Sequence, residues 1–208
     1  MSPAFYPYSS DSDERQRFIA HATLLSVLLI WLIHLANGAL VTKAINIPWF
    51  IELPTFAGLT WGIYHGAAHL TWRYKWFRAL FRVQIPDLNG TWEGYLVSSF
   101  DPSKRIKCTL IIEQAWDSIG LIFETDQSRS CNGITGFAVK SPGGARLVYE
   151  YTNVPSAIAA TDSMHHHEGT QWLTLSEDGA GLKLEGDYYT GRDRRTYGSV
   201  EMRRISVA

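Results

Sequence analysis

The chain has 208 residues, and its 19 Lys and Arg residues nearly balance its 20 Asp and Glu residues, for a formal net charge of −1. This balance argues against a general nucleic-acid-binding protein, so we expect no nucleic-acid polymer as a partner. Two cysteines, Cys108 and Cys131, are too few for a disulfide framework. Residues 18–72 are almost all apolar, whereas the rest of the chain is mixed and rich in turn residues.

Residues 1–17 form a polar N-terminal tail in our interpretation, and the first apolar stretch, 18–41, follows it without any Asp, Glu, Lys or Arg. A hydrocarbon core about 30 Å thick requires roughly 20 apolar residues of helix, so this stretch predicts a transmembrane helix. A buried helix of a soluble protein and a cleaved signal peptide are the alternatives. The mixed charges before the stretch and the absence of a clear small-residue cleavage site speak against the signal peptide.

A second charge-free stretch runs from Leu53 to Trp72, and a basic segment with Arg73, Lys75 and Arg78 follows it. Basic flanks of membrane spans lie on the cytoplasmic side. The sequence therefore predicts a two-helix transmembrane hairpin over residues 18–72, with both termini cytoplasmic, and a basic juxtamembrane linker over residues 73–86. Membrane lipid is then one of the protein's partners.

Three glycines in the second stretch, Gly58, Gly62 and Gly66, recur at a spacing of four and therefore lie on one helix face. Small residues allow a partner backbone to approach closely in a lipid-embedded helix. The partner is either the first helix of the same hairpin or another protomer. We name the three glycines as candidate residues for homo-oligomerisation.

Residues 87–208 read as an all-β domain, because about eight alternating segments are separated by short turns and no helical pattern lies between them. We predict a small up-and-down antiparallel β-barrel, with a sandwich as the alternative. The expected strands are Leu88–Ser99, Arg105–Gln114, Ser118–Thr125, Cys131–Lys140, Arg146–Asn153, His165–Ser176, Leu182–Thr190 and Arg194–Ile205.

Alternate connections of a meander lie at the same end of a barrel, and the longer, more basic loops here all fall at the end far from the linker. Side chains alternate between the two faces of a strand, so apolar inward positions lead to polar ones near this far mouth. An apolar floor below convergent polar groups is typical of a ligand site. The predicted ligand-binding residues are Ser98, Arg105, Tyr151, Asn153, His167, Tyr188, Thr190, Arg192, Arg194 and Thr196.

Three further glycines, Gly94, Gly186 and Gly198, fall at inward positions. They either leave room for a ligand or mark bends that help the sheet to close.

The chemistry of the predicted mouth favours an anionic ligand, because Arg donates paired hydrogen bonds to phosphate and tyrosines stack on nucleobases. The alternative is that these arginines form a solvated rim. The His165-His166-His167 run lacks metal-ligand spacing, and we expect no metal site. No nucleophile motif or carboxylate pair is present, so we expect no catalytic residues, no enzyme activity and no cofactor.

The hydrophobic hairpin, the basic flank, and a barrel that opens with NGTWEGYLVSS and closes with GDYYTGRDRRTYGSVEMRR resemble one known family. The chain is similar, from the first span to Arg204, to the two-transmembrane β-barrel effectors of CBASS. CBASS is the bacterial anti-phage system signalled by cyclic oligonucleotides.

The resemblance implies a mechanism. An infection-activated nucleotidyltransferase makes a cyclic dinucleotide, the barrel binds it, the protomers oligomerise, and the spans disrupt the inner membrane so that the cell stops growing or dies. Two alternatives remain: a membrane-anchored, lipocalin-like barrel that binds a lipid or fatty acid, and a membrane-anchored protein-interaction scaffold.

Overall fold

The computed structural model of the chain describes residues 3–40, 49–156, 165–192 and 194–206. The chain forms two compact units, one made of residues 13–84 and the other of residues 1–12 together with 85–208. The connection predicted between the two spans, residues 42–52, and one of the loops predicted at the far mouth, residues 154–164, fall partly outside the described residues. The predicted division into tail, hairpin, linker and barrel stays a prediction.

The first unit is helical, with elements α1 (Glu14–Leu40), α2 (Trp49–Gly66), the π-helix η1 (Ala67–Thr71) and α3 (Lys75–Phe81). Among the described residues, one helix is long and apolar enough to cross a membrane, and it covers Glu14–Ala36 of α1. The second predicted span corresponds to α2 and η1, which do not reach that criterion. The first predicted span thus coincides with a candidate span, and the second stays a prediction.

Packing between α1 and α2 does not use the glycine face. Thr60 of α2 donates a hydrogen bond to Ser26 of α1 over 3.0 Å. By contrast, a Cβ atom added at Gly58, Gly62 or Gly66 would meet no atom within 4 Å outside its own helix backbone. Among the described residues, no atom outside α2 therefore covers the face that carries the three glycines.

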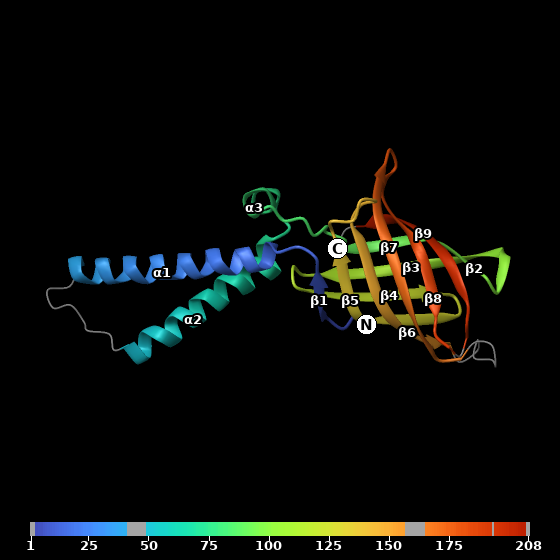
Figure 1. Ribbon diagram of the computed structural model, residues 1–208, viewed down its shortest axis with the longest axis horizontal. Helices are drawn as coiled ribbons and strands as arrows, with labels where there is room; N and C mark the ends of the chain where they lie inside the picture. Colours follow the sequence, from blue (N-terminus) through green and yellow to red (C-terminus); the bar gives the residue numbers. More distant parts are fainter. Residues whose placement is uncertain (1–2, 41–48, 157–164, 193, 207–208) are drawn as a thin grey trace. The chain divides into compact units, whose positions relative to one another are not determined.

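The second unit is a closed sheet, shown in Figure 1, in which the described residues form nine strands in the order β1-β4-β3-β2-β9-β8-β7-β6-β5. Strands β2 to β9 follow one another as an antiparallel meander, and β9 pairs with β2. The prediction of an all-β closed domain is confirmed, and the sandwich is wrong, because one continuous sheet surrounds the core. The meander comprises β2 (Gly90–Ser98), β3 (Asp101–Gln114), β4 (Ser118–Thr125), β5 (Ser128–Ala138), β6 (Arg146–Pro155), β7 (His167–Asp178), β8 (Gly181–Thr190) and β9 (Tyr197–Ser206).

The additional strand, β1, is Tyr6–Ser10, a segment that the sequence analysis placed in a polar tail. Strands β4 and β5 pair only over Ile122–Glu124 and then diverge. Strand β1 fills the gap, antiparallel to β4 and parallel to β5. Where the two strands diverge, the Asn132 side chain takes the place of a backbone hydrogen bond between β4 and β5. Its Oδ1 accepts a hydrogen bond from the backbone N–H of Leu121 over 2.8 Å.

Two side chains hold β1 in place. Tyr8 is buried, its ring centroid lies 4.9 Å from that of Phe137, and its hydroxyl donates to the carbonyl of Trp116. The Asp11 carboxylate accepts hydrogen bonds from the backbone N–H groups of Val139 and Lys140 over 2.8 and 3.1 Å. The segment before α1 is therefore part of the barrel that follows α2.

We expect Tyr8→Ala to lower the free energy of unfolding of the barrel by about 3 kcal/mol, because it removes a buried aromatic ring and leaves a cavity. Tyr6→Ala is the matched control, since Tyr6 lies on the same strand with 44% of its surface exposed. Thermal unfolding of the full chain, followed by circular dichroism of the sheet, measures the difference. Equal unfolding temperatures for the two variants would show that β1 contributes nothing to barrel stability.

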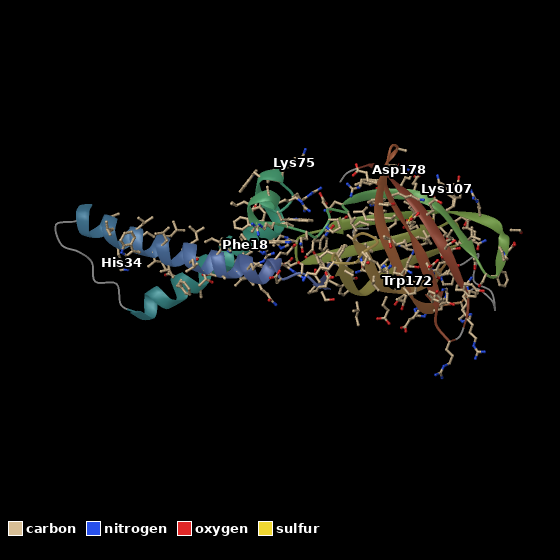
Figure 2. All side chains as sticks on the ribbon, turned by 45° about the horizontal axis from the view of Figure 1, so that its top comes forward. Phe18, His34, Lys75, Lys107, Trp172 and Asp178 are labelled. Atoms are coloured by element: carbon tan, nitrogen blue, oxygen red, sulfur yellow. The ribbon has the colours of Figure 1, made fainter. Side chains whose placement is uncertain are left out.

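The barrel interior follows the predicted alternation. Trp92, Cys108 and Leu110 are buried, whereas Lys107 lies on the outer face (Figure 2) and pairs with Glu93 at 3.2 Å. Burial raises the pKa of the Cys108 thiol to about 12, so this cysteine stays protonated. The predicted inward strand faces are therefore confirmed for the core.

Close packing between neighbouring strands requires glycine at three positions, Gly94, Gly186 and Gly198. A Cβ atom at any of them would collide with a backbone carbonyl of the neighbouring strand, from Glu201, Trp172 and Val97 respectively. None of the three lines the cavity described below. The interpretation that they leave room for a ligand is wrong, because the approaching strand occupies that room.

Candidate ligand-binding site

A cavity with about 100 Å³ of space open to water-sized groups lies inside the barrel. Apolar side chains such as Leu96, Phe123 and Val200 line part of it, and polar side chains line the rest. The predicted contrast between apolar and polar parts of the interior is present.

Eight of the ten predicted site residues line this cavity. They come from the ends of β2, β6, β7 and β8 and from the connection into β9, where the meander brings them together. Their contact with a ligand stays a prediction. The eight are Ser98, Tyr151, Asn153, His167, Tyr188, Thr190, Arg194 and Thr196.

Arg105 and Arg192 do not line the cavity. Arg105 precedes the inward-facing Ile106 on β3, so alternation directs it to the outer surface, where it borders a shallow groove beside Tyr95. Arg192 is exposed in the connection between β8 and β9. Neither side chain lines the cavity, and their role in ligand binding stays a prediction.

Several polar residues line the cavity that were not predicted from the sequence, among them Ser128 and Ser130 of β5 and Gln171 of β7. Gln171 could have been predicted from the alternation of side chains along β7. It lies four residues after His167 on the same strand and therefore on the same face. A signal for Ser130 was weaker, since β5 begins at Ser128, earlier than predicted.

Arg194 is the one Lys or Arg among the described residues that line the cavity. Its positive charge acts on Tyr151, Tyr188 and His167. Burial raises the pKa of Tyr151 and of Tyr188, and the charge of Arg194 opposes that rise only in part. Both phenols therefore stay neutral, and Arg194 supplies a fixed positive charge for an anion.

Hydrogen bonds among side chains hold the polar wall in one arrangement. The Asn153 side-chain amide donates to the hydroxyls of Ser128 and Ser130 over 3.0 and 2.8 Å. Across the mouth, the Thr190 hydroxyl donates to the carbonyl of Thr196 over 2.9 Å. A wall that is ordered before binding lowers the entropic cost of holding a ligand.

His167 is buried, and its pKa lies below the ordinary value because of burial and then because of the nearby positive charge of Arg194. His165 and His166 add to the decrease, and the hydrogen bond of the ring to the His165 carbonyl opposes it. Without ligand, the pKa of His167 is lower in the folded chain than in the unfolded chain, where it is about 6.5. The unfolded chain therefore binds the proton at a higher pH than the folded chain does. As the pH falls below about 6.5, the contribution of His167 to the free energy of unfolding is lost.

Binding of an anion should have the opposite effect, because a phosphate favours the protonated imidazole. We expect ligand affinity to rise as the pH falls from about 7.5 to about 5.5, with proton uptake on binding. Calorimetry in buffers of different ionisation enthalpy measures the number of protons taken up on binding. The His167→Gln variant should lack the protons that the His167 imidazole takes up. Identical proton uptake by the variant would exclude His167 from anion binding.

The residues that the structure describes contain no group of three or more His, Cys, Asp or Glu side chains that could hold a metal ion. The cavity thus offers a fixed positive charge, neutral phenols and ordered hydroxyl and amide groups. This set of groups can bind an anionic ligand that also carries aromatic or hydroxyl groups.

A closed barrel with a ready-made polar cavity and an arginine beside it defines a small-ligand receptor domain. Residues 83–204 match the family model described as "Cap15, cyclic dinucleotide receptor domain". The chain belongs to this family, and its ligand is a cyclic dinucleotide.

The chain is also similar to a curated protein, "CD-NTase-associated protein 15" from Yersinia aleksiciae. The two are 28% identical over 198 residues, which cover 92% of this chain and 91% of that protein. The resemblance to the β-barrel effectors of CBASS is confirmed.

Proposed function

We propose that the protein is a non-enzymatic CBASS effector anchored in the bacterial inner membrane by two spans. Its cytosolic barrel binds a cyclic dinucleotide, binding drives homo-oligomerisation, and the assembled spans disrupt the membrane and arrest growth or kill the cell. The observation that carries this proposal is the polar cavity beside Arg194, joined in one chain to a helix able to cross a membrane.

The place of β1 supports two spans with both termini on one side. Strand β1 precedes α1, yet it pairs with β4 and β5 of the barrel that follows α2. If α1 crosses the membrane, the chain must cross back before β2, because the two flanks belong to one closed sheet. The segment available for that return is α2 with η1, which together cover Trp49–Thr71.

The uncovered glycine face of α2 supports association between protomers. Because no described residue of α1 packs against Gly58, Gly62 or Gly66, that face is open to a second copy of the chain in the lipid. A ligand shifts the equilibrium toward an assembly only if it binds the assembled form more tightly than the single protomer. We therefore expect ligand affinity to be higher in the oligomer.

Calorimetry of the full chain in lipid nanodiscs tests the receptor function, against cyclic di-AMP, cyclic di-GMP, a linear dinucleotide and a fatty acid. The full chain is required because a fragment that begins at Ile85 would lack β1. Saturable binding of a cyclic dinucleotide supports the proposal. Binding of the fatty acid alone would favour the lipocalin-like alternative, and no binding by the folded chain would favour the scaffold.

Membrane disruption has its own test. We expect Gly62→Leu to keep saturable ligand binding, at the lower affinity of the single protomer, and to abolish growth arrest when the protein is expressed together with its nucleotidyltransferase, because the larger side chain blocks close helix approach. Gly62→Ala is the matched control and should retain growth arrest. Undiminished growth arrest by Gly62→Leu would contradict a role of the glycine face.

A further inference from the structure

Two buried amide atoms in the cavity lack a hydrogen-bond partner among the described residues: Nε2 of Gln171 and Oδ1 of Asn153. Gln171 is only 3% exposed and Asn153 7% exposed, and both side chains line the cavity. Buried polar groups are nearly always paired in folded proteins, so an unpaired one in a cavity wall calls for a functional explanation.

The Gln171 amide is held in one orientation by Tyr149. The two residues are directly opposite each other on β7 and β6, and the Tyr149 hydroxyl donates to Oε1 of Gln171 over 2.6 Å. Burial raises the pKa of Tyr149, which keeps its phenol protonated and able to donate. With its oxygen engaged, the amide is left with the unpaired Nε2 donor, in a side chain that lines the cavity.

Gln171 lies well below the mouth. Register places Tyr149 opposite Gln171 and Asn153 opposite His167, so the two pairs are separated by four residues along the strands. At about 3.3 Å per residue this is roughly 13 Å. Arg194 acts on His167 at the upper level. A phosphate held there leaves the depth between the two levels for a nucleobase.

The side chains around that depth suit a base. Tyr151, between Tyr149 and Asn153 on the inward face of β6, offers an aromatic surface, and Phe123 and Ile106 contribute apolar wall. A base that enters edge first would bury its leading edge against the Gln171 donor. That edge then meets the unpaired Nε2 donor, and an acceptor on the base pairs with it, whereas one lone pair of the amide oxygen is already used by Tyr149.

The nucleobases differ in the hydrogen-bond acceptors that their edges carry. Guanine presents O6 and N7, both acceptors, on its major-groove edge, and uracil, like thymine, presents O4. Adenine presents an amino group beside N7, and cytosine presents an amino group. Adenine can offer the Gln171 donor only N7, and its amino group beside N7 adds a second buried donor, whereas guanine offers two acceptors on this edge.

We infer that Gln171, positioned by Tyr149, is a specificity-determining residue that selects a cyclic dinucleotide with at least one carbonyl-edged base, guanine or uracil, over one that contains adenine alone. The inference rests on the cyclic dinucleotide receptor function proposed above. A well-matched base contact typically gives about tenfold discrimination against the wrong base.

Calorimetry of the full chain in nanodiscs tests the inference with cyclic di-GMP, cyclic di-UMP and cyclic di-AMP. We expect cyclic di-GMP or cyclic di-UMP to bind about tenfold more tightly than cyclic di-AMP. Gln171→Met keeps the size of the side chain and removes the donor. It should lower the affinity for the preferred ligand about tenfold and leave the affinity for cyclic di-AMP within about twofold of the native value.

Tyr149→Phe gives a second readout. It frees the Gln171 oxygen to accept from an amino group, so it should reduce discrimination by improving cyclic di-AMP binding, which a merely structural role would not do. Retained cyclic di-AMP binding shows that each variant is folded.

Equal binding of the three ligands by the native chain, or a preference for cyclic di-AMP, would overturn the inference even if a variant fails to fold. Retained discrimination in Gln171→Met would also overturn it. Failure of all three ligands to bind would instead contradict the receptor function itself.

Discussion

Arg194→Ala should weaken cyclic dinucleotide binding by about 10- to 100-fold. Arg194 is the one Lys or Arg among the described cavity-lining residues, so no other lining guanidinium or ammonium group in the described residues can replace its charge. Hydrogen bonds to charged groups contribute about 1.5–3 kcal/mol, and each 1.4 kcal/mol corresponds to about a tenfold change in affinity. Calorimetry of the full chain in nanodiscs measures the change.

Arg105→Ala is the matched control, because it removes the same side chain from the outer face of the barrel. We expect its affinity to stay within about twofold of the native value, since an exposed charge at a distance is screened by salt. If Arg105→Ala lost as much affinity as Arg194→Ala, the ligand would bind across the outer rim and not inside the cavity. An unchanged affinity in Arg194→Ala would remove that residue from the site.

Gly94→Ala should lower the free energy of unfolding by about 3 kcal/mol, near the upper end of the usual range for overpacked sites. The added Cβ would collide with backbone atoms of Glu201 and Met202 on β9, and a backbone cannot rotate away as a side chain can. For a domain of this size we expect the unfolding temperature to decrease by roughly 10 °C. Thermal denaturation of the full chain followed by circular dichroism measures it.

Gly133→Ala is the control for this substitution, because Gly133 also lies in a strand and an added Cβ would come no closer than 3.9 Å to Glu150. We expect the control to change the unfolding temperature by only a few degrees. If Gly94→Ala were as stable as Gly133→Ala, strands β2 and β9 would not need the close approach that the structure shows.

Much of the barrel was predictable because alternation is a local property. Strand β4 runs over Ser118–Thr125, as expected, and the inward faces of β2, β3 and β6 follow from the apolar residues at every second position. The same reasoning placed Tyr151, Asn153 and Arg194 together at the cavity, although they come from different segments.

The errors arose where a residue's place depends on a distant segment. The five residues of β1 carry no strand pattern of their own, and they are ordered by the gap between β4 and β5. Arg105 was grouped with the mouth by its charge, although the alternation on β3 directs it outward.

The sequence by itself determined an apolar segment able to cross a membrane, an all-β domain of alternating strands and the family resemblance to CBASS effectors, since each follows from local pattern and composition. Only the tertiary structure decided that β1 completes the barrel and that Gly94 serves strand packing. It also decided that Gln171 lines the cavity with its amide oxygen engaged and its Nε2 donor unpaired. These features depend on which strands become neighbours, and pairing between segments far apart in the chain is not encoded in any one of them.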